Sequence, residues 1–321
     1  MSFFLSTLKQ NGHLDQVVMT ICNVGSRKLS NNNDYGGQAW GLFAPNLTIY
    51  GFDADEDACN IANANIEARK VDWHEEHFPV VLSNIVGEAT LYVTHNPMCS
   101  SLYPPNESFL KRFDGMLELS GLDFTIDLET TTLDSVFQTN NLNSIDFLQI
   151  DVQGADLQVL EGATNLLDQG ILAIQVEVEF SHLYVNQPLF AEVDTFARKH
   201  GFILFDLDVS RWSRSPICSA SRPGQILWGD AFYLRDPLHE NCSSAFKQPT
   251  AILKLACIAD ILGLTDYALE LLGFLTLEYG SHDSRYNVAN SLVESLRQIP
   301  ELTQAALESL PIMSKIQHLL T

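Results

Sequence analysis

The chain has 321 residues, 46% of them hydrophobic, which is enough for one large domain with a full core or for a domain with an appendage. Acidic residues outnumber basic ones, 40 Asp and Glu against 18 Lys and Arg, and the formal net charge is -22. A field of that sign repels polyanions, so nucleic acid and acidic membrane surfaces are not expected partners.

The N-terminal residues and the cysteines show no sign of export. The first residues, MSFFLSTLKQNG, lack the basic start and long apolar core of a signal peptide, and no apolar run approaches the roughly 20 residues that cross a bilayer. None of the six cysteines belongs to a C-x-x-C pair. We therefore expect a cytoplasmic protein with reduced cysteines.

The first part of the chain alternates predicted strands with predicted helices. Strands are predicted at residues 17–24, 47–52, 78–82 and 88–94. Helices are predicted at residues 38–44 and 55–69. Residues 27–37 are predicted to form a polar loop, and prolines make residues 95–120 irregular.

The same alternation continues to residue 236. Strands are predicted at residues 145–150, 171–180, 202–207 and 226–234, with helices at 156–163 and 187–200. The pattern predicts a mostly parallel sheet with helices on both faces. The last strand follows a long loop that contains Arg211, Arg214 and Arg222 and no predicted helix, so this strand is expected to run antiparallel.

The composition changes after Pro237, and residues 248–321 are helical in pattern, with interruptions at Pro300 and Pro311. We predict a Rossmann-like domain over residues 1–236 and a helical appendage over 248–321. The appendage resembles a single tetratricopeptide-type hairpin, and it is a candidate surface for a protein partner or a second copy of the chain.

Residues 145–163, IDFLQIDVQGADLQVLEGA, form the most informative stretch. A short apolar run ends in Asp151, and a glycine and a helix-forming segment follow. Open α/β sheets bind ligands at the carboxyl ends of such strands. Asp151 is therefore a candidate catalytic residue, with a structural cap of the following helix as the alternative.

Two further strand ends carry candidate cofactor ligands. In N-V-G-S, Asn23 to Ser26, Gly25 allows the close backbone approach that a nucleotide-type cofactor needs. Asp53 ends the second strand beside Ala54, where a carboxylate can accept both ribose hydroxyls of an adenosine. A helix N-cap role is assigned to Asp55 instead. A three-glycine dinucleotide fingerprint is missing, which disfavours an NAD-dependent oxidoreductase.

Glu177 and Glu179 alternate with apolar residues in a predicted buried strand, an arrangement that costs free energy unless the carboxylates are paired or lie at a site. Glu177 is a candidate behind Asp151, and His182 follows the same strand; Asp151, Glu177 and His182 are the three candidate catalytic residues. The H-E-E-H run at residues 74–77 has the wrong spacing for a zinc site, so we predict a solvated helix end there and no metal.

Together these stretches resemble the FkbM-type methyltransferases, a family of enzymes that use S-adenosylmethionine. The strongest match is DFLQIDVQGADLQVLEGA, and GFDADEDACNIANANI is similar to the family's second strand and helix. LSNIVGEATLYV with SSLYPPN looks like its third strand and serine loop, and QVEVEF with LYVNQPLFAEV like its fifth strand and helix. The resemblance covers about residues 18–235.

The resemblance implies a Rossmann-like sheet that ends in an antiparallel strand, and methyl transfer to a hydroxyl of a sugar or natural product. By position, Gly25 would hold the methionine part of the cofactor, Asp53 its ribose, and Ser83 with Asn84 would lie near its adenine. Asp151 would lie near the sulfonium and the acceptor.

The sequence departs from the family pattern at several positions, and the second glycine of the first motif is replaced within RKLS, residues 27–30. Asn23 replaces an acid, Gln149 a lysine, and Gln153 and Asp156 replace the hallmark glutamates. Two interpretations remain: a small-molecule O-methyltransferase, or a non-catalytic module that binds cofactor and recruits a partner through its helices.

Overall fold

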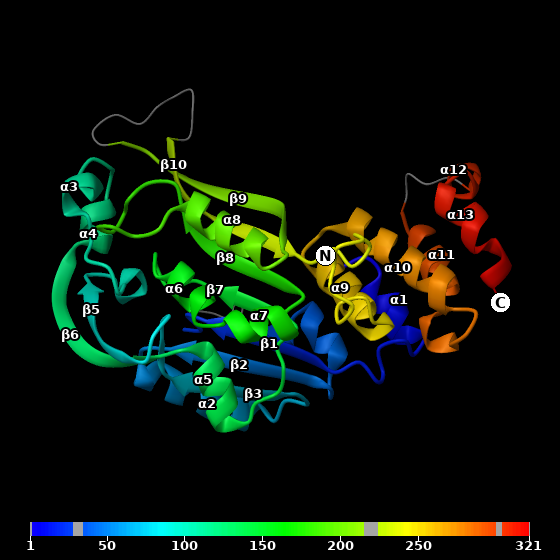
Figure 1. The fold of residues 1–321 in the computed structure, drawn as a ribbon, viewed down its shortest axis with the longest axis horizontal. Helices are drawn as coiled ribbons and strands as arrows, with labels where there is room; N and C mark the ends of the chain where they lie inside the picture. Colours follow the sequence, from blue (N-terminus) through cyan, green and yellow to red (C-terminus); the bar gives the residue numbers. More distant parts are fainter. Residues whose placement is uncertain (1, 28–34, 215–223, 300–303, 321) are drawn as a thin grey trace.

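The computed structural model describes residues 2–27, 35–214, 224–299 and 304–320 (Figure 1). Cys218, Arg222, Pro300 and most of the predicted polar loop lie outside the described residues. Cys22, Cys59, Cys99, Cys242 and Cys257 are all free thiols.

A seven-stranded sheet forms the centre of the molecule, in the order β3-β2-β1-β7-β8-β10-β9. Its strands are β1 Met19–Val24, β2 Leu47–Asp53, β3 His74–Pro79, β7 Phe147–Ile150, β8 Ala173–Glu179, β9 Ile203–Trp212 and β10 Gln225–Leu234. The pairs from β3 to β8 are parallel, while β10 runs antiparallel to both β8 and β9. The predicted Rossmann-like sheet with an antiparallel last strand is confirmed.

The two faces of this sheet bury different sets of residues, because neighbouring residues of a strand point to opposite faces. On one face, Cys22, Leu148 and Val176 belong to an apolar cluster with the helices that follow β6, β7 and β8. These helices are α5 Leu133–Asn140, α6 Asp156–Glu161, α7 Thr164–Gln169 and α8 Phe190–Lys199. On the other face, Ile21 and Phe147 pack with the C-terminal helices and with the 3-10 helix η3, Ala39–Phe43.

A second, three-stranded sheet has the order β4-β6-β5 and consists of β4 Val81–Leu82, β5 Gly87–Thr94 and β6 Leu122–Thr131. Figure 1 shows β5 and β6 beyond the upper left end of the main sheet, on the side away from the C-terminus. Three helices come between β5 and β6 in the sequence: the 3-10 helix η4 Pro97–Cys99, α3 Glu107–Leu110 and α4 Met116–Ser120.

Several predicted elements need correction. The predicted strand 78–82 is divided between β3 and β4, and β5 lies in the second sheet instead of serving as the third strand of the main sheet. The third strand is β3, which includes the H-E-E-H run that we had predicted to be a solvated helix end. Charged residues hid this strand, although Glu75 and His77 are buried in it. Likewise β9 extends to Trp212, so Arg211 lies in a strand.

The helix α2, Glu56–Arg69, follows β2, and the Asp55 side chain accepts a hydrogen bond from the Ala58 N–H at 3.0 Å. This confirms the N-cap role assigned to Asp55. An aspartate at that position supplies an acceptor for one of the free N–H groups of the first turn.

The C-terminal helices pack together at the other end of the molecule (Figure 1). They are α9 Pro249–Ile261, α10 Thr265–Tyr279, α11 Ala289–Leu296, α12 Gln304–Glu308 and α13 Pro311–Ile316. The N-terminal helix α1, Leu5–Gln10, which we did not predict, joins them: the Asp260 carboxylate accepts the N–H groups of Phe3, Phe4 and Leu5.

The helices also contact the sheet directly. Lys254 of α9 forms an ion pair with Asp146, just before β7, at 2.8 Å, and Tyr267 of α10 donates to the Arg235 carbonyl at 2.6 Å. The division of the chain into residues 1–236 and 248–321 stays a prediction, since both parts contribute to one apolar cluster.

Candidate active site

A cavity of about 400 Å³ lies at the carboxyl ends of β1, β2 and β7. β1 pairs with β2 on one side and with β7 on the other, so the strand order reverses here. Open α/β sheets usually bind their ligands at this reversal point. Gly25, Asp53, Ala54 and Asp151 all line this cavity. The structure therefore brings together residues that are far apart in the sequence and that we had selected separately.

Gly25 brings the ends of β1 and β7 into close contact. Its φ of +84° is rare for other residues, and a Cβ atom there would lie 2.0 Å from the carbonyl oxygen of Asp151. The Gly25 and Ser26 N–H groups both donate to the Phe52 carbonyl, at 2.8 and 2.9 Å. The loop after β1 is thereby fixed against the end of β2.

Asp53 is held by backbone groups on both of its oxygens. Oδ2 accepts the Arg27 N–H at 3.1 Å, and Oδ1 accepts the Asp55 N–H at 2.9 Å. Burial raises the pKa of Asp53, while the charge and the backbone N–H of Arg27, followed by His77, oppose the shift. Each carboxylate oxygen accepts a second hydrogen bond readily, so this carboxylate can bind a pair of hydroxyls on the cavity side.

Asp151 is linked to Glu177 by Gln153. The Gln153 side-chain amide donates to Asp151 Oδ1 and to Glu177 Oε2, both at 2.9 Å. Tyr184 donates to Gln153 Oε1 at 3.0 Å. Gln153 has a φ of +58°, an uncommon conformation for a residue with a side chain, so the turn holds its amide between the two carboxyl groups at some conformational cost.

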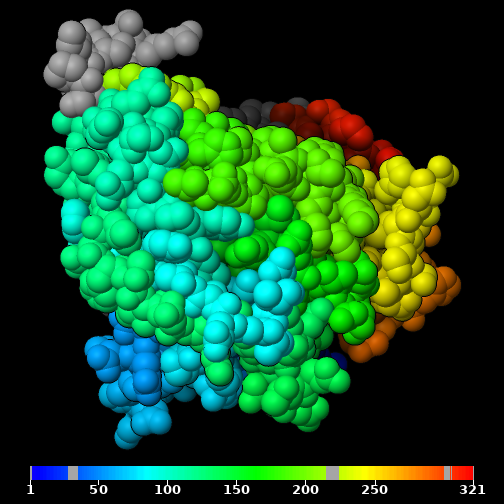
Figure 2. Space-filling model, turned by 60° about the vertical axis from the view of Figure 1, so that its left-hand side comes forward, coloured from blue at the N-terminus to red at the C-terminus, as the bar shows by residue number. Residues whose placement is uncertain are grey.

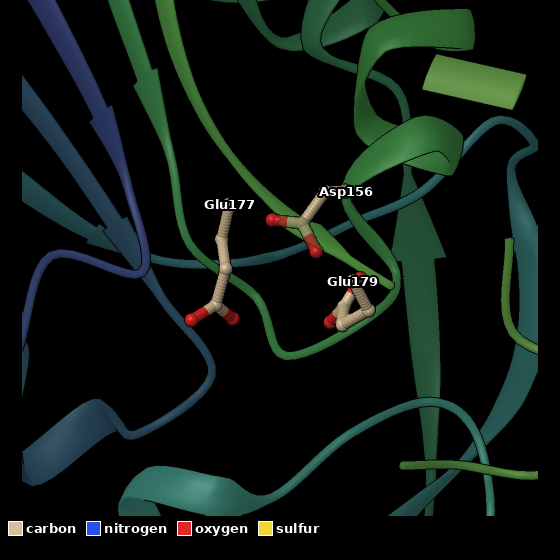
Figure 3. A group of neighbouring side chains, drawn as sticks. All are labelled: Asp156, Glu177 and Glu179. Atoms are coloured by element: carbon tan, nitrogen blue, oxygen red, sulfur yellow. The ribbon is translucent and has the colours of Figure 1, made fainter. Parts of the chain in front are cut away.

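Three carboxyl groups, those of Asp156, Glu177 and Glu179, lie behind Asp151 and are gathered around one space (Figure 3). Burial, followed by the charge of Asp151, raises the pKa of Asp156 to about 7. The pKa of Glu177 is raised well above its usual value by the same two causes. Burial also raises the pKa of Glu179, with Asp156 as the next cause. These groups therefore hold protons at a pH where exposed carboxyls are ionised.

The same oxygens lie within 4.8 Å of one another, close enough to surround one hard cation. Two of the three groups already have donors: Asp156 accepts the N–H groups of Val152 and Gly154, and Glu177 accepts the Gln153 amide. The raised pKa values mean that bound protons can reduce the negative charge of this cluster, and the absence of a metal stays a prediction.

The remaining cofactor candidates lie near the cavity and outside its lining. Asn23 is half-buried in β1, in register with Gln149 of β7. Ser26 is buried, with its hydroxyl 3.0 Å from Nδ1 of His77. Ser83 is buried and donates to Asn84 Oδ1 at 3.3 Å, whereas Asn84 is exposed and donates to Glu161. Their roles stay predictions.

His182 is exposed on the loop after β8, and its carbonyl oxygen accepts a hydrogen bond from Asn106 at 2.9 Å. In the described part of the chain, no hydrogen bond joins its ring to Asp151 or Glu177. The proposed catalytic role of His182 therefore stays a prediction without a contact that supports it.

The second sheet forms an apolar wall of the cavity that sequence reasoning missed. Leu91 and Val93 of β5 pair with Ile126 and Phe124 of β6, and all four side chains line the cavity. Phe124 is 50% exposed and Ile126 45% exposed. Figure 2 turns this side toward the reader, and the cyan and teal residues of β5 and β6 stand beside the green residues that follow β7.

Strand order and site together define a Rossmann-like methyltransferase fold. Residues 45–204 match the family model described as the methyltransferase FkbM domain. The chain belongs to the FkbM methyltransferase family, and the cofactor of this family is S-adenosylmethionine.

Solved structures give distant similarities only. Magnesium protoporphyrin IX methyltransferase from Synechocystis PCC 6803 with bound SAM shares 11% identity at a TM-score of 0.34, over 72% of this chain and 76% of that one. Methyltransferase FkbM from Methylobacillus flagellatus KT shares 7% sequence identity at a TM-score of 0.36, and the match covers 66% of this chain and 43% of that one. Sp1610 from Streptococcus pneumoniae, a putative tRNA (m1A22) methyltransferase, shares 11% sequence identity at a TM-score of 0.34, and the match covers 99% of this chain and 97% of that one.

A comparison with curated proteins finds no match. Among the described helices, none combines the length and the apolar character that a membrane span requires.

Proposed function

We propose that this protein transfers a methyl group from S-adenosylmethionine to a hydroxyl oxygen of a small molecule, a sugar or a natural-product-like compound. The observation that carries the proposal is Asp151: its carboxylate lines the same cavity as Gly25 and Asp53 and is oriented by Gln153.

The residues of the cavity fit the cofactor. Asp53 would bind the ribose hydroxyls, and the backbone at Gly25 comes close enough to the cavity to bind the methionine part. Asn23, Ser26 and Ala54 would complete the loop around these groups. Ser83 and Asn84 follow β4, whose Val81 and Leu82 supply an apolar surface suited to the adenine.

When bound, S-adenosylmethionine supplies a methyl carbon on a positively charged sulfur, which leaves with the bonding electron pair. The chain has to align the acceptor oxygen with that carbon, and such positioning is worth on the order of 7–11 kcal/mol. Asp151 accepts the hydroxyl proton as the new C–O bond forms. Asp151 also offsets the positive charge before the transfer.

The properties of Glu177 favour Asp151 as the group that accepts the hydroxyl proton. Burial and the neighbouring Asp151 charge raise the pKa of Glu177, so Glu177 keeps a proton more readily than an exposed glutamate does. The amide of Gln153 holds both groups in place. Glu177 itself, or His182 after a movement of its loop, is the alternative base.

The acceptor would lie between Asp151 and the apolar wall of β5 and β6. Leu91, Val93, Phe124 and Ile126 would cover an apolar part of the acceptor, which favours a natural-product-like compound over a free sugar. The net charge of -22 disfavours nucleic acid as the acceptor. We also propose a cytoplasmic location, and the C-terminal helices as the contact for a partner or a second copy.

The alternative is a non-catalytic module that binds cofactor, and the replacements Asn23 and Gln149 favour it. The experiment that separates the two incubates the wild type and the Asp151→Asn variant with S-adenosylmethionine and a panel of hydroxyl compounds, and measures S-adenosylhomocysteine release. Release that depends on one acceptor and is lost in the variant supports the enzyme. Cofactor binding without release on any acceptor favours the module.

A further inference from the structure

The H-E-E-H run of β3 presents two different pairs of side chains. His74 is exposed and Glu76 half-buried, and their side chains lie 3.7 Å apart on one side of the strand. Glu75 and His77 point to the other side, because side chains alternate along a strand, and both are buried. The second pair has no role in the function proposed above.

A chain of hydrogen bonds runs through this buried pair to the loop after β1. Trp73 Nε1 donates to Glu75 Oε2 at 2.8 Å, and Glu75 Oε1 lies 3.0 Å from His77 Nε2. His77 Nδ1 lies 3.0 Å from the hydroxyl of Ser26. A carboxylate only accepts, so Nε2 carries the proton, and in the neutral ring Nδ1 accepts from Ser26.

The backbone around His77 is adapted to this arrangement. A Cβ atom on Gly51 of β2 would lie 2.2 Å from His77 Nδ1 and 2.7 Å from the Ser26 hydroxyl, so only glycine leaves room for their contact. Asn63 of α2 binds the His77 N–H and carbonyl, both at 2.8 Å. The ring of His77 is thus held by Ser26 and Glu75, and its backbone by Asn63.

Ser26 connects this chain to the cavity. It follows Gly25 and precedes Arg27, whose N–H binds Asp53. A loop held in its binding conformation before the ligand arrives loses less entropy on binding. Any group that fixes the Ser26 side chain therefore favours binding at both Gly25 and Asp53.

We propose that His77, oriented by Glu75, is a positioning residue that holds the cofactor loop through Ser26. The proposal rests on the proposed cofactor site. It gives the buried half of the H-E-E-H run a role in cofactor affinity, although neither His77 nor Glu75 lines the cavity.

Two substitutions of His77 separate the two sides of the ring. An asparagine places its amide where Nδ1 lies and keeps the contact with Ser26, while a glutamine reaches the Nε2 position and keeps the contact with Glu75. We expect His77→Gln to weaken S-adenosylhomocysteine binding about tenfold, or about 1.4 kcal/mol, and His77→Asn to weaken it by less than about threefold.

The measurements are calorimetric titration and the melting temperature of each variant without ligand. His74→Gln and His74→Asn, on the exposed side of β3, are the matched controls and should leave affinity unchanged. Ser26→Ala removes the same contact from the other side and should weaken S-adenosylhomocysteine binding as much as His77→Gln does. This variant replaces His77→Gln in the test if His77→Gln does not fold.

A purely structural histidine would give two variants with similar losses of melting temperature and the same affinity as the wild type, and that result would overturn the proposal. Equal weakening by both variants would also overturn it, because the Ser26 contact would then be irrelevant. A wild type that does not bind S-adenosylhomocysteine would instead overturn the proposed function.

Discussion

Replacing Asp53 by alanine tests the cofactor site at the residue that should contribute most to affinity. In the free protein both carboxylate oxygens accept a backbone N–H, from Arg27 and from Asp55, and the side chain faces the cavity. A hydrogen bond to a charged group contributes about 1.5–3 kcal/mol, so two ribose hydroxyls would gain roughly 3–6 kcal/mol.

The expected loss in Asp53→Ala is smaller than that sum, because water can enter the space and bind the hydroxyls in the variant. We expect a loss of roughly 2–4 kcal/mol, which corresponds to an increase of about 30- to 1000-fold in the Kd for S-adenosylhomocysteine. The fold should survive, since this strand-end carboxylate contributes little to the apolar core.

Calorimetric titration measures this Kd directly. Asp57→Ala, which removes the same charge from an exposed position of α2, is the matched control and should bind as the wild type does. Asp53→Asn separates charge from shape and should fall between the two. A folded Asp53→Ala variant with unchanged affinity would refute the assignment of Asp53 to the ribose.

Three further predictions follow from the same geometry. Asp151→Asn should abolish methyl transfer and leave the Kd for S-adenosylhomocysteine within about tenfold of the wild-type value; full turnover on an identified acceptor would reduce Asp151 to a structural role. The raised pKa values of Glu177 and of Asp156, the latter about 7, mean that the folded state holds protons that the unfolded state releases above about pH 4. The stability that these protons contribute is present at acid pH and is lost as the pH rises through the folded pKa values. The melting temperature of Glu177→Gln should therefore fall less steeply with rising pH than that of the wild type. Equal slopes for the two proteins would contradict this prediction. A chain ending at residue 236 should melt cooperatively at a lower temperature, because the sheet loses the apolar cover of residues 248–321; an insoluble or gradually melting product would show that the helices are integral to the sheet.

The sheet could be predicted because its central strands are short apolar runs with polar residues at their carboxyl ends. β1, β2 and β7 follow that pattern, and the strand ends then place Gly25, Asp53 and Asp151 at one edge of the sheet. The antiparallel direction of β10 was predicted from the resemblance and from the long connection before it, which has no predicted helix.

β3 could not be predicted from its local pattern, and β6 was missed although its residues alternate between apolar and polar. β3 carries the charged run His74–His77, and its buried positions are filled by polar groups that satisfy one another. β6 is exposed over most of its length, with Phe124 and Ile126 facing the cavity in place of a core. β3 lacks the apolar face on which sequence-based assignment depends, whereas the apolar residues of β6 alternate with polar ones as far as Glu129.

The role of Gln153 depends on a contact that no spacing shows. Its conformation, with φ of +58°, directs the amide back between Asp151, directly after β7, and Glu177 of β8. The one signal in the sequence is that Gln153 replaces a hallmark glutamate of the family. An amide can donate to both carboxyl groups, whereas a second carboxylate there would repel them.

The central claim is that the cavity at the ends of β1, β2 and β7 binds S-adenosylmethionine and its demethylated product. Calorimetric titration of the full chain with S-adenosylhomocysteine, and separately with NAD and NADP, tests it most directly. The account predicts saturable binding of S-adenosylhomocysteine and no appreciable heat with either dinucleotide. Binding of NAD without any response to S-adenosylhomocysteine would contradict it.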